Sequence, residues 1–196
     1  MTVSIEMIKQ LRELTGAGVL DCKKALEQTE GDLEAASEIL KQKGLAAAAK
    51  KANRVAGDGL VEAYVHAGGK LGVLVEVNCE TDFVARTDEF QTFCHDVAMQ
   101  IAAVDPKWIS RDDVPEDVLD EQKDAIRAEL AGENKPEHVM DRIIEGKLRK
   151  FYEKNCLLDQ QFIRNEDQTV QQLLTETIAK LGENIVIARF ARFQIG

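Results

Sequence analysis

Two runs of alternating apolar and polar residues, joined by a glycine turn, constrain the fold of this chain most. Residues 60–66 and 71–78 place apolar side chains at every second position, which is the period of a strand with one buried face. The four residues between the runs, Ala-Gly-Gly-Lys at positions 67–70, suit a tight turn. We therefore expect a β-hairpin, followed by a second turn and then a helix.

The second turn falls in residues 78–86, which read NCETDFVAR. Phe83 stands there among charged side chains, at a point where the chain changes direction. An aromatic ring in such a place either packs under the turn as local core or projects as an anchor for a pocket on a partner. Most aromatic rings in proteins are buried, so the residues alone favour local core.

Before the hairpin, residues 4–44 show the 3.6-residue period of three short helices. Ser4 is placed to cap the first helix and Asp32 the third, while Gly16 and Gly44 are placed to end the same two helices. Residues 45–58 are either a helical extension or a linker. One apolar face is expected on the first helix, formed by Ile5, Ile8, Leu11 and Leu14.

The rest of the chain predicts helices between the hairpin and one late strand. Thr87 is placed to cap a helix from Asp88, Pro115 and Pro136 each suit the first turn of another, and residues 170–181 form a fourth that ends at Gly182. The expected buried positions of these helices are Phe90, Cys94, Val97, Ile101, Val104, Leu119, Ile126, Leu130, Val139, Met140, Ile143 and Leu148. Residues 184–195 alternate as a final strand.

These elements predict an α+β protein with two parts. The first, residues 1–55, is a three-helix bundle and linker, and the second, residues 56–196, is an α+β core with a small antiparallel sheet. Three strands leave exposed edges and one poorly covered face, which a second copy of the chain could cover.

The net charge of −10 is unevenly distributed and bears on the kind of partner. Residues 1–55 hold nine basic and eight acidic side chains, a balance of +1, whereas the remainder holds sixteen and twenty-seven, a balance of −11. Nucleic-acid binding depends on clustered Lys and Arg, so direct binding to nucleic acid is not expected. No apolar run is long enough for a membrane span, and the first residues lack the pattern of a signal peptide, so the cytoplasm is the expected location.

The residues that could carry chemistry do not form a catalytic or metal-binding set. The four cysteines lack CxxC spacing and the three histidines are scattered, so they predict no zinc site and suit a reducing compartment. Cys79 lies beside Glu80, and neighbouring acids raise a thiol pKa, which is the wrong direction for a nucleophile. The TGAG sequence at residues 15–18 lacks the Lys-Ser/Thr of a phosphate loop and suits a turn between helices. We therefore expect no enzyme and no cofactor.

Four segments together resemble one family. They are LRELTGAGVLDCKKAL at residues 11–26, NCETDFVAR at 78–86, EGKLRKFYEKNCLLDQQFI at 145–163 and GENIVIARFARFQIG at 182–196. The chain is similar along essentially its whole length to the elongation factor Ts family, the nucleotide-exchange factors of the translational GTPase elongation factor Tu. The resemblance implies an N-terminal bundle of the ubiquitin-associated type.

The resemblance also implies a function and a set of partner contacts. The chain would bind elongation factor Tu·GDP, displace magnesium and release GDP so that GTP can bind. The contacts implied at the turn are Thr81, Asp82, Phe83 and Val84, those implied on the bundle are Leu11, Val19, Leu20 and Lys23, and a weaker inference adds His66. The residues themselves support part of this, because Val19 and Leu20 are adjacent apolar residues that cannot both face one small core.

The size of the chain bears on its assembly. The longest family members carry a duplicated core subdomain, whereas only one copy fits in this chain, so we expect a homodimer paired through the sheets and a two-to-two complex. In that complex the turn of one protomer and His66 of the other would touch one partner. Two other functions stay open from the residues: an adaptor that uses only the N-terminal bundle, and, less supported, an enzyme.

Overall fold

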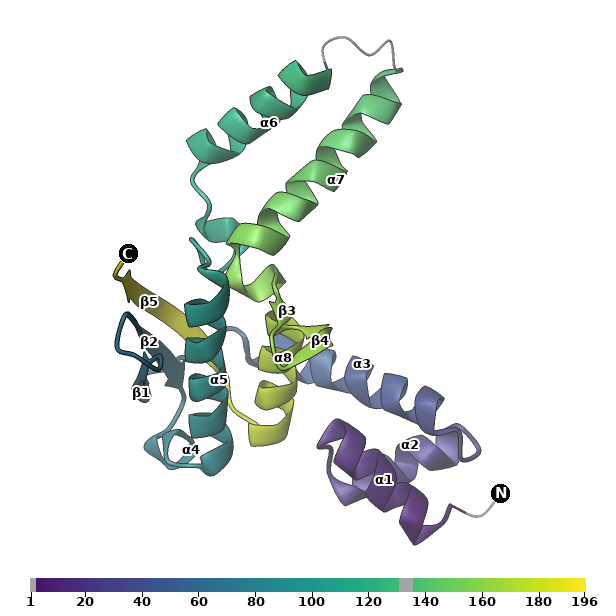
Figure 1. The fold of residues 1–196 in the computed structure, drawn as a ribbon. Coiled ribbons are helices and arrows are strands. Elements are labelled where there is room, and N and C mark those ends of the chain that lie inside the picture. Colours follow the sequence, from purple (N-terminus) through teal and green to yellow (C-terminus); the bar gives the residue numbers. More distant parts are fainter. Residues whose placement is uncertain (1–2, 131–135) are drawn as a thin grey trace. The chain divides into compact units, whose positions relative to one another are not determined.

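The computed structural model describes residues 3–130 and 136–196 (Figure 1). N-terminal helices precede a three-stranded antiparallel sheet with the strand order β1-β2-β5, and a separate two-stranded sheet pairs β3 with β4. The expected α+β fold class is confirmed. The chain divides into two compact units, and the boundary expected near residue 55 stays a prediction. One unit contains Met1–Glu62, Val75–Asp96 and Gln172–Ala188, and the other contains Ala63–Leu74, Val97–Gln171 and Arg189–Gly196.

The N-terminal bundle consists of α1 (Ile5–Thr15), α2 (Val19–Gln28) and α3 (Leu33–Lys51). Ser4 caps α1 through its side chain, and Gly16 ends that helix in the left-handed conformation with φ of 65°. Asp32 caps α3 by accepting hydrogen bonds from two backbone amides. The buried core of the bundle is Leu11, Cys22, Ala25, Leu26, Ala36 and Leu40.

Two details of the bundle differ from the sequence-based expectation. Gly44 does not end α3, which continues through the alanines to Lys51, because one glycine costs a helix only about 1 kcal/mol relative to alanine. The apolar face of α1 is also narrower than expected. Ile5 and Leu14 are exposed, Ile8 is half-buried, and Leu11 is the one member of that set in the core.

The hairpin forms as the alternation predicts. It consists of β1 (Asp58–Val65) and β2 (Leu71–Cys79), and β5 (Val186–Gln194) pairs with β2 on the other side. In β2 the buried side chains are Val73, Val75, Val77 and Cys79, one at every second position. In β1, by contrast, Val61 and Val65 are exposed, so the apolar side of that strand is uncovered in the single chain.

A single-turn helix, α4 (Asp82–Ala85), follows β2 and leads into α5 (Asp88–Val104). Thr87 caps α5 as expected, since its hydroxyl accepts a hydrogen bond from the Phe90 amide at 3.2 Å. The expected buried stripe of α5 is confirmed at Phe90, Cys94, Val97 and Ile101. Val104 was expected in that stripe but is partly exposed at the end of the helix.

Beyond α5, the second unit contains α6 (Glu116–Leu130) and α7 (Glu137–Asn155), which run side by side as a helical hairpin (Figure 1). Pro115 and Pro136 precede these helices as predicted. Ile126 and Leu130 of α6 are buried and Leu119 is half-buried. The expectation for α7 was wrong, because a two-helix hairpin covers each helix on one side only. Its expected core positions are all half-buried, namely Val139, Met140, Ile143 and Leu148.

The remaining elements are short, except for α8 (Val170–Leu181), which ends before Gly182 as predicted. The 3-10 helices η1 (Arg111–Asp113) and η2 (Leu157–Asp159) were not expected. The strands β3 (Gln161–Phe162) and β4 (Asn165–Thr169) were not expected either. Along the described ranges, no helix is both long and apolar enough to cross a membrane.

Candidate functional site

The tip loop, residues 81–84, joins β2 to the helix that follows. Thr81 is the N-cap of α4, and its hydroxyl oxygen accepts a hydrogen bond from the Val84 amide at 3.4 Å. Asp82 forms an ion pair with Arg86 at 2.7 Å, one helical turn further on. Thr81, Asp82 and Val84 are each partly buried. The backbone of the tip loop is therefore held by local hydrogen bonds.

Phe83 is the exception in this loop, because its side chain is 79% exposed. Ala85 and Phe90, which follow it closely in sequence, are buried. The ring therefore does not pack under the turn as local core, which was the explanation that the residues alone favoured. The projecting explanation fits the structure, and the contact with a partner stays a prediction.

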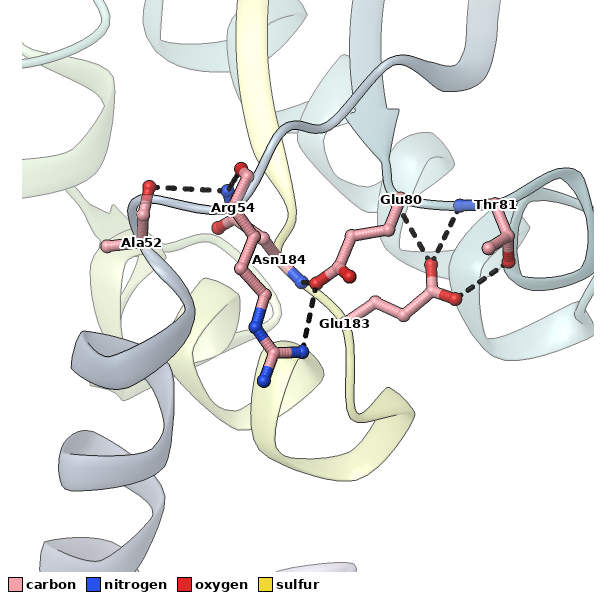
Figure 2. A network of polar contacts seen from close by, with 6 residues as sticks. All are labelled: Ala52, Arg54, Glu80, Thr81, Glu183 and Asn184. Atoms are coloured by element: carbon pink, nitrogen blue, oxygen red, sulfur yellow. Dashed lines mark hydrogen bonds and ion pairs between the residues drawn. The ribbon is translucent and has the colours of Figure 1, made fainter.

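A carboxylate from a distant part of the chain holds the start of the tip loop (Figure 2). Glu183 Oε2 accepts hydrogen bonds from the backbone amides of Glu80 at 3.1 Å and Thr81 at 3.0 Å. Its other oxygen, Oε1, accepts one from the Thr81 hydroxyl at 2.7 Å. Three donors of Glu80 and Thr81 thus converge on one side chain that follows α8.

The two segments also bind each other in the reverse direction. Glu80 Oε1 accepts a hydrogen bond from the Asn184 amide at 2.7 Å and pairs with Arg54 at 3.5 Å. Asn184 is buried, and its side-chain amide donates to the carbonyls of Arg54 at 2.8 Å and Ala52 at 3.4 Å (Figure 2). The network therefore ties three segments together: the end of α3, the tip loop and the residues before β5.

Cys79 lies at the base of the tip loop and is fully buried. Its thiol donates a hydrogen bond to the Thr81 carbonyl at 3.2 Å. Burial raises the pKa of this thiol, and the negative charge of Glu183 raises it further. The expected direction of the pKa shift is confirmed, although burial rather than the flanking acids is its main cause. This environment opposes a thiolate nucleophile.

The other cysteines share this burial, since all four are free thiols inside the fold. Their expected character as small buried apolar residues is confirmed. Within residues 3–130 and 136–196, no three His, Cys, Asp or Glu side chains are grouped so as to hold a metal ion.

On the N-terminal bundle, the corner between α1 and α2 presents apolar side chains to solvent. Val19 is 51% and Leu20 is 72% exposed, so both point away from the core, where the sequence had suggested only one. Leu14 is also exposed just before the turn at Gly16 and was not singled out as a contact. Exposed apolar groups on both sides of one turn favour a docking corner.

Two other predicted contact residues of the bundle have different surroundings. Lys23 is half-exposed and pairs with Glu27 across one helical turn at 3.7 Å. Leu11 is fully buried in the bundle core. Leu11 therefore packs inside the bundle and does not reach the surface at the corner between α1 and α2.

His66, the weakest of the predicted contacts, follows β1 in the second unit and is exposed. Its Nδ1 atom lies 2.9 Å from the Tyr64 hydroxyl, and the two rings are tilted with centroids 6.1 Å apart. Its backbone amide donates to the Leu71 carbonyl at 2.8 Å, which closes the hairpin. The ring is thus held at the surface by a neighbour on its own strand.

Comparison with known proteins identifies the family. A family model described as Elongation factor TS matches residues 22–196. The chain belongs to the elongation factor Ts family. Its motifs had already suggested this family, and the assignment makes the chain an elongation factor of protein biosynthesis.

Individual members of the elongation factor Ts family are similar over nearly the full chain. The Elongation factor Ts of Thermoanaerobacter sp. (strain X514) is 60% identical over 194 residues, which are 99% of this chain and 95% of the relative. That of Caldanaerobacter subterraneus subsp. tengcongensis is also 60% identical, over 99% of this chain and 97% of the relative. That of Thermosipho melanesiensis is 51% identical and covers 99% of both chains.

Proposed function

We propose that this chain is the guanine nucleotide exchange factor of elongation factor Tu. It binds elongation factor Tu·GDP, promotes loss of magnesium and release of GDP, and leaves the GTPase free to bind GTP. Membership of the elongation factor Ts family supports the partner and the overall role. The observation that carries the mechanism is the 79% exposure of Phe83 on a loop whose other residues are held in place.

Exchange of this kind requires selective binding and no covalent step. A GTPase holds GDP through backbone amides around the phosphates and through a bound magnesium ion. A ligand that prefers the nucleotide-free conformation lowers the barrier to release. A thousandfold acceleration requires about 4 kcal/mol of differential stabilisation. A buried aromatic anchor contributes about 2–4 kcal/mol when it is tested by truncation, so one ring and a few further contacts are sufficient.

The residues of the tip loop have separate roles in this mechanism. Phe83 inserts into the GTPase domain of the partner and displaces the segment beside the magnesium site. Asp82 adds a polar contact near the water shell of the metal, for which it must leave its ion pair with Arg86. Thr81 and Val84 keep the loop folded through the hydrogen bond between them.

The N-terminal bundle provides the second contact. Val19 and Leu20 are exposed and fit an apolar patch on the nucleotide-binding domain of the partner, while Lys23 adds a charge at the same corner. Leu11 acts indirectly, because its burial fixes the packing of α1 beneath the corner. This contact adds to the binding that Phe83 provides.

A homodimer completes the proposal. In the second unit, Val65 of β1, Phe193 of β5 and Ile195, which follows β5, are all exposed, and β1 and β5 belong to one sheet. Exposed apolar side chains on the two edge strands of one sheet suit the face of a second copy. His66 follows β1 directly, so in a two-to-two complex it would reach the partner molecule bound to the other protomer. The reaction needs no catalytic residue or cofactor from this chain, and its place is the cytoplasm, where translation occurs.

Release of a fluorescent GDP analogue from elongation factor Tu tests the proposal. The native chain is expected to accelerate release, and Phe83→Ala is expected to lower the maximal rate about thirtyfold or more, from loss of about 2 kcal/mol or more of anchor binding. Val55→Ala is the control, since Val55 is 85% exposed outside the proposed contacts, and it should behave as the native chain. Unchanged GDP release with the native chain would overturn the proposal and favour an adaptor function.

A further inference from the structure

We propose that Glu183 is a positioning residue for nucleotide exchange, whose carboxylate fixes the tip loop in the conformation that presents Phe83. The inference rests on the proposed function and assigns a role to a residue about one hundred positions away from the loop in sequence. It follows from the hydrogen-bond network in Figure 2 and from the 79% exposure of Phe83.

The donors at the start of the tip loop match a carboxylate. A carboxylate accepts hydrogen bonds at both oxygens and donates none. Glu183 uses one oxygen for two consecutive backbone amides and the other for the Thr81 hydroxyl. Glutamine at this position would keep one acceptor oxygen but turn an NH₂ group toward the hydroxyl, so it would reproduce only part of the arrangement.

An anchor from outside the loop adds to its local hydrogen bonds, which span only one helical turn. A single helical turn such as α4 is too short to be stable in isolation. Phe83 adds no packing, since its ring is exposed. Beyond its local hydrogen bonds, the loop is fixed at Thr81, which the Glu183 carboxylate holds at two atoms, and at Ala85, which is buried.

The anchor itself is held from both sides. Asn184, the next residue, donates its backbone amide to Glu80 and its side-chain amide to the carbonyls of Ala52 and Arg54. The backbone position of Glu183 is thus fixed by its neighbour, and charge-assisted hydrogen bonds give the carboxylate a defined geometry. Glu183 accepts hydrogen bonds from the backbone amides of Glu80 and Thr81, and Glu80 accepts one from the backbone amide of Asn184. The two segments therefore hold each other in place.

A fixed loop affects exchange in a specific way. When the ring is already in its binding position, the ordering of the loop is complete before the partner arrives. Without the anchor, the loop must become ordered when Phe83 inserts, and the conformational entropy lost at that point raises the barrier to insertion. The maximal rate of GDP release then falls, whereas the concentration for half-maximal effect, which depends on the bundle contacts, changes little.

Amide hydrogen exchange in the free chain tests the positioning role without elongation factor Tu. In Glu183→Ala the backbone amides of Glu80 and Thr81 should exchange about tenfold faster or more, because their charged acceptor is lost. Glu183→Gln should give an intermediate increase. Glu121→Ala, a substitution of an exposed glutamate on α6, is the control and should leave both amides unchanged. Unchanged protection in Glu183→Ala would overturn the inference.

GDP release from elongation factor Tu tests whether Glu183 acts through Phe83. Glu183→Ala should lower the maximal release rate about tenfold with little change in the half-maximal concentration, and Glu183→Gln should recover part of the rate. In a double-mutant cycle, Glu183→Ala should have no further effect in a Phe83→Ala chain. Additive losses would show a general structural role and would contradict the inference.

The two experiments separate this inference from the proposed function. If Phe83→Ala reduces GDP release and Glu183→Ala does not, the positioning role fails while the proposed function stands. If Phe83→Ala leaves release unchanged, the wedge mechanism fails, and with it the role of Glu183 in exchange. Circular dichroism and thermal unfolding of each variant establish that the chain remains folded, and Glu183→Gln, which keeps the shape of the side chain, serves if Glu183→Ala does not fold.

Discussion

Phe83 and Glu183 show how two residues with opposite surroundings serve one loop. The ring of Phe83 is exposed, which costs solvation free energy in the free chain and becomes favourable only when a partner buries it. The carboxylate of Glu183 is satisfied within the chain by three donors. We propose that Phe83 binds the partner and that Glu183 holds the loop that carries it.

At the same scale, the buried thiol of Cys94 predicts a pH dependence of stability. Burial raises its pKa from 9.0 to about 12 in the folded chain, with a further contribution from Glu62. Because the folded pKa is the higher one, the stabilisation is complete below pH 9 and is lost as the pH rises toward 12. At pH 10 the ionised thiol of the unfolded chain lowers the free energy of unfolding by about 1.4 kcal/mol.

Urea unfolding at pH 7 and pH 10 measures this effect. Between pH 7 and pH 10 the free energy of unfolding should fall in both chains. The fall should be about 1.4 kcal/mol smaller in Cys94→Ala than in the native chain. The comparison of differences removes the contributions of the other titrating groups and of the cavity. An equal fall in both chains would contradict a protonated thiol in the native state.

The residues that sequence could predict are those whose partners are close in the chain. Ser4, Asp32 and Thr87 cap helices that begin within three residues, so their roles follow from spacing. Glu183 binds residues 102 and 103 positions away, and no local pattern identifies such a contact. The one available signal was its place at the start of the GENIVIARF segment, which marked a region and not a role.

At the scale of elements, two glycines predict opposite responses to the same substitution. Gly59 in β1 has φ of 143°, and an added Cβ would lie 2.2 Å from the Val77 carbonyl oxygen, so Gly59→Ala forces β1 away from β2. Gly146 lies inside α7, and nothing lies within 4 Å of the position its Cβ would take. Alanine there removes the entropic penalty of glycine in a helix.

Thermal unfolding of both variants tests this contrast. Gly146→Ala is expected to stabilise the chain by about 0.5–1 kcal/mol, and Gly59→Ala to destabilise it by about 1–3 kcal/mol. For a chain of this length, about 1 kcal/mol corresponds to a shift in Tm of about 2–4 °C. A fall in Tm for Gly146→Ala would show that α7 is packed at this position, contrary to the structure.

Elements with a long, regular pattern were predicted and those without one were not. The strands β1 and β2 alternate along most of their length, and the helices α5 and α8 keep a helical period over several turns. The type of each element could therefore be predicted from the sequence. β3 contains two residues, too few to show an alternation, and was missed. Gly44 was the one stop signal near the end of α3, and residues 45–51 contain none. The helix continues past Gly44 because the alanines that follow favour a helix.

At the scale of the whole molecule, the exposed apolar residues of β1 and β5 predict self-association. Phe193 is 70% exposed, and Phe193→Asp would place a charge in the proposed dimer face. Burial of an unpaired carboxylate is strongly unfavourable, so this variant is expected to be monomeric in multi-angle light scattering at concentrations where the native chain is a dimer. Glu121→Asp keeps the charge and serves as a control that stays dimeric.

The light-scattering result also decides the stoichiometry of the exchange complex. A dimeric native chain with impaired exchange in Phe193→Asp would support the two-to-two complex. A native chain that is a stable monomer at working concentration and has full exchange activity would contradict it. In that case the role of His66 on the second partner molecule would also be lost.

The central claim is that the ring of Phe83 binds the nucleotide-free partner more tightly than the GDP-bound partner. Coupling between two ligands of one protein is reciprocal. If the chain lowers the affinity of elongation factor Tu for GDP by some factor, GDP must lower its affinity for the chain by the same factor. Dissociation constants of the native chain for elongation factor Tu with and without GDP give this factor directly. The same pair of measurements on Phe83→Ala isolates the contribution of the ring.

We predict that Phe83→Ala weakens binding to nucleotide-free elongation factor Tu by about thirtyfold or more and changes binding to the GDP complex much less. The coupling factor should therefore fall by about the same amount. Equal weakening in both nucleotide states would mean that the ring is an ordinary contact, and it would contradict the wedge mechanism.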